Sequence, residues 1–128
     1  MLAMRVGIGI LGGGTVGGSL ANQLLREAST INSKSGIQPE LVGVGVRDVS
    51  KTREFPVEFA TTDLAGLVSD ERVQLVVELM GGIEPARSLL IQALDAGKPV
   101  VTANKELMAR HGEELIRHAA DKGVSLLF

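Results

Sequence analysis

The sequence predicts an α/β fold in which helices cover both faces of a doubly wound parallel sheet. Short apolar runs alternate with stretches of helical periodicity, as expected for parallel strands joined by crossover helices. The first apolar run, residues 5–11, passes directly into a glycine turn, and a length of 128 residues suits one domain. With a right-handed crossover at each step, we expect a three-layer Rossmann-type sheet with the strand order 3-2-1-4-5-6.

The glycine turn has the pattern G-x-G-x-x-G, with its glycines at Gly12, Gly14 and Gly17. In this pattern Gly12 takes the tight turn, Gly14 leaves room for a pyrophosphate, and Gly17 lets the next helix approach the strand. The backbone N–H groups of Thr15, Val16 and Gly17 point out of the helix N-terminus, where the helix dipole favours an anion. We therefore interpret residues 1–128 as one dinucleotide-binding domain.

A helix with one buried stripe follows the glycine turn. The stripe consists of Val16, Leu20, Leu24 and Ala28. Residues 29–39 are polar and rich in turn formers, which predicts a surface loop. Residues 41–46 predict the second strand, residues 57–60 a short third strand, and residues 63–68 a small helix.

The apolar run at residues 73–79 predicts a fourth strand, buried on both faces. Glu84 and Pro85 are expected to start the next helix, because a proline at that position loses no hydrogen bond. The inner face of this helix is Ala86, Leu89, Leu90, Ala93 and Leu94. Gly97 suits its C-terminal cap.

The remainder of the chain predicts a fifth strand, a helix and a sixth strand. Residues 99–102 form the fifth strand, and Asn104 can cap the helix that follows. We expect Gly112 to break that helix into two pieces, since glycine disfavours a helix interior, and Gly123 to close the second piece. Residues 124–128 then predict the sixth strand.

Composition excludes several classes of function. A net charge of −2 and only three Phe, with no Trp or Tyr, disfavour nucleic-acid binding. The absence of cysteine excludes disulfides, thiolate catalysis and cysteine metal sites. The N-terminal apolar run is too short to span a bilayer, and His111 and His118 lack neighbours at metal-ligand spacing. We expect a cytoplasmic protein that binds no metal, membrane or nucleic acid.

Ligands of such a sheet lie beyond the carboxyl ends of the strands, where the strand order reverses. At the tip of the second strand, an arginine accommodates a 2′-phosphate, and an acidic residue binds a free 2′-hydroxyl. Arg47 is the first residue past the apolar run and has Lys51 and Arg53 close behind, which favours NADP. Asp48 keeps NAD as the alternative, and Arg47 as a plain solvated cation is a third interpretation.

The turn Met80-Gly81-Gly82 follows the fourth strand, where the nicotinamide half of a cofactor should pass. An ordinary strand-to-helix turn would explain the two glycines equally well. Lys105 follows the fifth strand and is our candidate catalytic residue, because its ammonium can polarise a substrate oxygen; a surface lysine is the alternative. Glu78 lies inside an apolar strand, and we expect a nearby backbone group to satisfy it.

At these junctions the sequence resembles homoserine dehydrogenase. The similar blocks are residues 12–17, 77–86, 97–105 and 111–115, and the Glu-Leu-Met-Gly-Gly and Thr-Ala-Asn-Lys runs are the specific ones. The resemblance implies an enzyme that reversibly reduces aspartate 4-semialdehyde to homoserine with NADPH or NADH, on the route to threonine and methionine.

The resemblance also implies site residues. They are Thr15 and Val16 at the pyrophosphate, Arg47 at the adenosine ribose or its phosphate, Thr102 and Asn104 at the nicotinamide, and Lys105 in the active site. Family members continue into a substrate-binding and dimerisation domain, which is absent after Phe128. We therefore expect an isolated cofactor domain, either a fragment or a short gene product, without useful catalysis.

Two other functions fit the same residues. One is a stand-alone module that binds a dinucleotide without chemistry, and the other is a different oxidoreductase on the same fold, such as a dihydrodipicolinate reductase. A reading frame that continues past Phe128 would favour the enzyme, and a native stop codon there would favour the module. The apolar end, Leu126, Leu127 and Phe128, predicts self-association into homo-oligomers.

Overall fold

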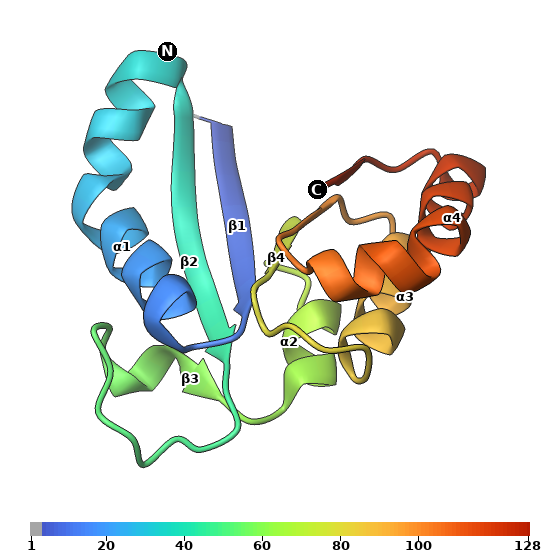
Figure 1. The fold of residues 1–128 in the computed structure, drawn as a ribbon. Helices are drawn as coiled ribbons and strands as arrows, with labels where there is room; N and C mark the ends of the chain where they lie inside the picture. Colours follow the sequence, from blue (N-terminus) through green and yellow to red (C-terminus); the bar gives the residue numbers. More distant parts are fainter. Residues whose placement is uncertain (1–3) are drawn as a thin grey trace.

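A computed structural model describes residues 4–128 and contains a parallel sheet of six strands in the order β3-β2-β1-β4-β5-β6 (Figure 1). The strands are β1 (Met4–Leu11), β2 (Ile37–Gly45), β3 (Ala60–Thr61), β4 (Leu75–Glu78), β5 (Val100–Thr102) and β6 (Leu126–Leu127). The helices are α1 (Thr15–Ser35), α2 (Leu64–Ser69), α3 (Ala86–Asp95) and α4 (Lys105–Lys122). The predicted doubly wound sheet and its strand order are confirmed.

Helices cover the sheet from both sides, which gives three layers. Figure 1 shows α1 on one side of β1 and β2, and α2, α3 and α4 on the other side. Two apolar clusters fill the spaces between the layers. The first joins Leu11 and Val76 of the sheet to Leu90 of α3 and Leu107 of α4. The second joins strand residues such as Ile10 to α1.

Burial on the α1 side of the sheet falls off from β2 toward the edge strand β6. A row of neighbouring side chains crosses the sheet on this side, through Val44, Ile10, Val77, Val101 and Leu127. Val44 and Ile10 are fully buried, Val77 is 9% exposed, and Leu127 at the far edge is 60% exposed. The α-helical residues of this cluster all come from α1, so the cover is thick over Ile10 and Val44 and thins toward β6.

The predicted loop at residues 29–39 is wrong. Helix α1 continues to Ser35 and ends at Gly36, whose positive φ of 75° suits glycine, and β2 begins at once at Ile37. The serines that suggested a loop stay in the helix, since the hydroxyl of Ser35 donates to the carbonyl of Ile31 at 2.7 Å. The last turns of α1 face solvent, which explains their polar sequence.

The predicted break at Gly112 is also wrong, because α4 runs without interruption from Lys105 to Lys122. Leu107, Leu115 and Ala119 bury one stripe of this helix in the apolar cluster that it shares with α3 and the sheet. That burial outweighs the cost of a helical glycine, which is about 1 kcal/mol.

The buried stripe of α1 is displaced from the predicted one at its first residue. Val16 is 66% exposed, whereas Gly17 and Ala21 are buried and Leu20 and Leu24 pack against the core. The prediction failed here because Gly17, not Val16, is the residue of the first turn that faces β1.

The predicted third strand is mostly a 3-10 turn. Val57–Phe59 form this turn, and only Ala60–Thr61 pair with β2. The small helix that follows is confirmed as α2, with the Asp63 carboxylate accepting from the amide of Gly66 at 2.9 Å.

The predicted inner face of α3 is confirmed. Its five residues are Ala86, Leu89, Leu90, Ala93 and Leu94, all buried. The helix begins at Ala86 with Pro85 as its N-cap, so Glu84 lies just outside it. Gly97 and Gly123 both have positive φ just past their helices, and Asn104 caps α4 as expected.

Candidate functional site

A cleft of about 980 Å³ opens at the carboxyl end of the sheet. Its walls are the glycine turn, the end of β2 with the loop that follows, and the turn after β4. The predicted site residues that line it are Gly12, Gly14, Thr15, Arg47, Lys51, Met80, Gly81 and Gly82. Those that do not line it are Val16, Gly17, Thr102, Asn104 and Lys105.

The three motif glycines have different environments. Gly12 has a φ of 112°, which suits the tight turn, and its amide donates to the carbonyl of Gly45 at the end of β2 at 2.9 Å. A Cβ on Gly17 would collide with the carbonyl oxygen of Gly12, so this glycine permits the close contact of α1 with β1. A Cβ on Gly14 would meet no heavy atom within 4 Å, because Gly14 faces the open cleft. These environments match the turn, helix-packing and ligand-approach functions of the motif.

The N-terminus of α1 opens beside this cleft. Gly14 is the N-cap without a side-chain hydrogen bond, and the first bond of the helix runs from the amide of Gly18 to the carbonyl of Gly14 at 2.7 Å. No carbonyl inside the helix is therefore placed to accept from the amides of Thr15, Val16 and Gly17. Amides placed in this way, with no acidic side chain in the first turn of α1, suit a pyrophosphate.

The loop after β2 presents Arg47 to the cleft and turns Asp48 away from it. Arg47 is exposed and lines the cleft. The carboxylate of Asp48 accepts from the hydroxyl of Ser50 at 2.6 Å and from its amide at 2.9 Å. These bonds hold the pKa of Asp48 below its ordinary value, and Asp48 does not line the cleft.

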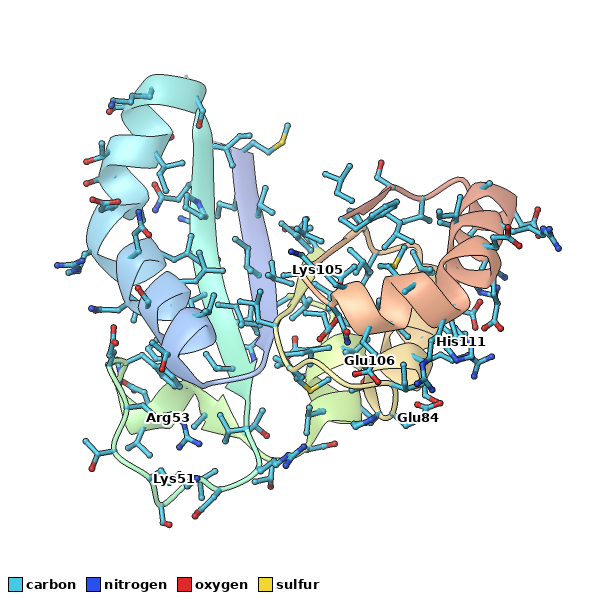
Figure 2. All side chains as sticks on the ribbon, viewed as in Figure 1. Lys51, Arg53, Glu84, Lys105, Glu106 and His111 are labelled. Atoms are coloured by element: carbon cyan, nitrogen blue, oxygen red, sulfur yellow. The ribbon has the colours of Figure 1, made fainter. Side chains whose placement is uncertain are left out.

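Arg53 connects the same loop to the glycine turn. Its Nη1 donates to the carbonyls of Asp48 and Lys51 at 2.6 and 3.1 Å, and its Nε donates to the carbonyl of Gly13 at 3.3 Å. The sequence suggested a phosphate contact for Arg53, but these backbone bonds occupy two of its nitrogens. Figure 2 shows Lys51 and Arg53 in the loop at one end of the fold.

The turn after β4 forms the opposite wall of the cleft. Gly81 and Gly82 have φ of 77° and 74°, so both need the freedom of glycine. Glu84 and Pro85 continue this wall; they lie in the block of residues 77–86 but were not among the predicted site residues. Hydrogen bonds from Ser88 hold the pKa of Glu84 below its ordinary value.

Thr102 and Asn104 are buried behind this turn and bond within the protein. Thr102 donates its hydroxyl to Glu78, and Asn104 donates its side-chain amide to the carbonyl of Gly82 at 2.6 Å. Lys105 is exposed at the first position of α4. Figure 2 shows Lys105, Glu84, Glu106 and His111 on the side of α3 and α4, away from Lys51 and Arg53. Contacts of Thr102, Asn104 and Lys105 with a nicotinamide or substrate stay predictions.

No group of three or more His, Cys, Asp or Glu side chains with metal-site geometry occurs within residues 4–128. His118 pairs with Asp95 through Nε2 at 2.6 Å, and Nδ1 of His111 lies 4.0 Å from a carboxylate oxygen of Glu114. Across the same residues, no helix combines the length and the apolar character that crossing a bilayer requires.

Comparison with known proteins identifies the family. A family model described as the NAD-binding domain of homoserine dehydrogenase matches residues 12–128, which include the cleft and all four helices. The chain belongs to the homoserine dehydrogenase family. It corresponds to the NAD-binding domain of these enzymes.

Similar homoserine dehydrogenases extend well beyond this domain. The chain is 44% identical over 126 residues to the enzyme of Synechocystis sp., covering 97% of this chain and 29% of that one. A crystal structure of homoserine dehydrogenase from Thiobacillus denitrificans matches with a TM-score of 0.88 and 39% identity, covering 100% of this chain and 30% of that one. A hyperthermophilic archaeal homoserine dehydrogenase in complex with NADPH shares the fold, with a TM-score of 0.75 and 21% identity over 98% of this chain and 44% of that one. The chain therefore spans about 29% of the curated relative.

Proposed function

We propose that this domain binds NADP in the cleft, with NAD as the weaker ligand. Arg47 carries the proposal, because it is the charged residue at the tip of β2 that lines the cleft, while the neighbouring Asp48 bonds to Ser50. A 2′-phosphate would gain charge-assisted hydrogen bonds from Arg47 and Lys51, and an acidic partner for a free 2′-hydroxyl is turned away. An archaeal relative of the same fold was solved with NADPH.

The remaining contacts follow from the walls of the cleft. The pyrophosphate would bind the amides at the start of α1, against the bare Cα of Gly14. The nicotinamide half would pass along Met80, Gly81 and Gly82, and bound NADPH supplies a hydride to a carbonyl carbon. We assign Lys105, at the N-terminus of α4, to polarising the carbonyl oxygen of the substrate.

The parent reaction that we propose is the interconversion of homoserine and aspartate 4-semialdehyde, in threonine and methionine synthesis in the cytoplasm. We further propose that the substrate site and the dimer contacts belong to the part of the family's enzymes that these 128 residues do not cover. The 128 residues alone would then bind cofactor without oxidising homoserine, since the groups that orient the substrate would lie in the part that they do not cover.

Calorimetric titration with NADPH and NADH, using wild type, Arg47→Ala and Arg110→Ala, tests the proposal. Arg110 is an exposed arginine of α4 and serves as the matched charge control. We expect wild type and Arg110→Ala to prefer NADPH, and Arg47→Ala to lose about 1.5–3 kcal/mol of NADPH affinity with little change for NADH. Equal NADPH affinity in all three proteins would remove Arg47 from the phosphate site, and the absence of binding to either cofactor would reject the proposed function.

A further inference from the structure

Glu78, the last residue of β4, is a fully buried carboxylate that the proposed reaction does not use. Its Oε2 accepts from the backbone amides of Met80 and Gly81 at 2.9 and 3.1 Å. Its Oε1 accepts from the hydroxyl of Thr102 on β5 at 2.5 Å. The sequence suggested one nearby backbone partner, but the carboxylate joins the turn after β4 to the end of the neighbouring strand.

Asn104 extends this network to the next helix. Its backbone amide donates to the hydroxyl of Thr102 at 3.0 Å, and its side-chain amide donates to the carbonyl of Gly82 at 2.6 Å. Its Oδ1 accepts from the amide of Leu107 at 3.0 Å and so caps α4. Glu78 thus holds one wall of the cleft and, through Thr102 and Asn104, the helix that begins at Lys105.

Each close partner of the Glu78 carboxylate donates a hydrogen bond to it, and a carboxylate oxygen accepts such bonds. The N-terminal dipole of α4 adds a favourable field. Gly81 lines the cleft and donates to this carboxylate, so one peptide unit separates the charge from the space where a nicotinamide would pass.

We propose that Glu78 is a positioning residue that fixes the Met80–Gly82 turn and also favours the oxidised cofactor through its buried charge. The inference rests on the proposed cofactor site. An oxidised nicotinamide ring carries a positive charge and a reduced ring carries none. A fixed negative charge behind the cleft wall therefore stabilises bound NADP⁺ more than bound NADPH, and screening by bulk water is weaker there than at the surface.

The test compares NADP⁺ and NADPH affinities of the chain and its variants. Glu78→Gln keeps the shape and removes the charge, and we expect the ratio of NADP⁺ to NADPH affinity to fall on the order of fivefold. Thr102→Val keeps the charge of Glu78 and removes one hydrogen bond to its carboxylate. The affinities for NADP⁺ and NADPH should therefore fall by a similar factor, and their ratio should not change. Glu113→Gln removes an exposed carboxylate of α4 and is the matched control, with neither value changed.

Amide hydrogen exchange gives a second measurement that needs no cofactor. The amides of Met80 and Gly81 should exchange slowly in wild type, although Gly81 is exposed, and faster in Thr102→Val. An unchanged affinity ratio in folded Glu78→Gln would overturn the charge effect. Unprotected amides in wild type would overturn the positioning role, even if Glu78→Gln does not fold. If wild type binds neither cofactor but both amides are protected, the proposed function fails and the positioning of the turn stands.

Discussion

Gly14 and Gly17 lie three residues apart in the glycine turn, and alanine should weaken a different property of the domain at each position. A Cβ on Gly17 would collide with the carbonyl oxygen of Gly12, which is backbone and has no rotamer to change. A Cβ on Gly14 would meet nothing within 4 Å, and its φ of −74° is open to alanine. We expect Gly17→Ala to destabilise the fold and Gly14→Ala to weaken cofactor binding.

The size of both effects follows from these environments. Overpacking costs about 1–3 kcal/mol, and we expect the upper end for Gly17→Ala because α1 must move away from β1. The entropy that alanine removes from the unfolded chain returns about 0.4–1 kcal/mol, which leaves a net loss of about 2 kcal/mol. For a domain of this size that loss lowers Tm by roughly 6–10 °C. Gly14→Ala should cost at most about 1 kcal/mol, as a poorer N-cap.

Thermal unfolding and NADPH titration of both variants provide the measurements. Gly14→Ala should melt close to wild type and bind NADPH at least about tenfold more weakly, because the methyl group occupies the position of the pyrophosphate. The larger Gly14→Val change should abolish binding in a folded protein. Retained affinity in Gly14→Val with an unchanged circular dichroism spectrum would show that this glycine has no part in binding. A wild-type Tm for Gly17→Ala would refute the packing argument.

Three further predictions concern other parts of the chain. Leu127 and Phe128 are 60% and 72% exposed, so the chain should self-associate at high concentration; aspartate at both positions should give a monomer, and a monomeric wild type in sedimentation would contradict this. Hydrogen bonds from Arg72 lower the pKa of Asp70 from 3.8 to about 2. The ionised Asp70 therefore stabilises the fold fully above pH 3.8, and this stabilisation is lost as the pH falls through about 2. Melting curves of wild type and Asp70→Asn should therefore differ at neutral pH and converge near pH 2. Arg53→Met removes the hydrogen bonds that hold the loop after β2 and should lower the free energy of unfolding, measured with denaturant, by about 1.5–3 kcal/mol. An unchanged unfolding midpoint would mean that these bonds do not hold the loop.

Local signals predicted the strand order and most helix ends, because these depend on neighbouring residues. Asn104 caps its helix through its own side chain, and Gly97 and Gly123 take the positive φ that follows a helix. The glycine turn was predicted for the same reason, since Gly12 takes a positive φ and Gly17 leaves room for the carbonyl oxygen of Gly12. The right-handed crossover rule, together with the strand order typical of dinucleotide-binding sheets, then placed the strands.

The wrong predictions concern segments whose secondary structure is decided by packing against distant parts of the chain. Gly112 disfavours a helix by itself, but burial on the sheet carries α4 through it. Residues 29–35 read as a loop because only their local composition was visible, and they continue α1 instead. The network of Glu78 was missed for another reason. Thr102 lies 24 residues further along, and only the pairing of β4 with β5 brings the two side chains together.

The uneven cover on the α1 side of the sheet sets an order in which the domain can open. Strand β1 is covered on both faces, with Ile10 in one apolar cluster and Leu11 in the other, so exchange of its amides requires most of the core to separate. Leu127 lies on a two-residue edge strand and leaves most of its side chain in solvent on that side. We therefore expect β6 of the 128-residue chain to separate from β5 more readily than β2 separates from β1. The half of the sheet that holds the glycine turn should then open last, and the pyrophosphate end of the cleft should stay formed while the far edge opens.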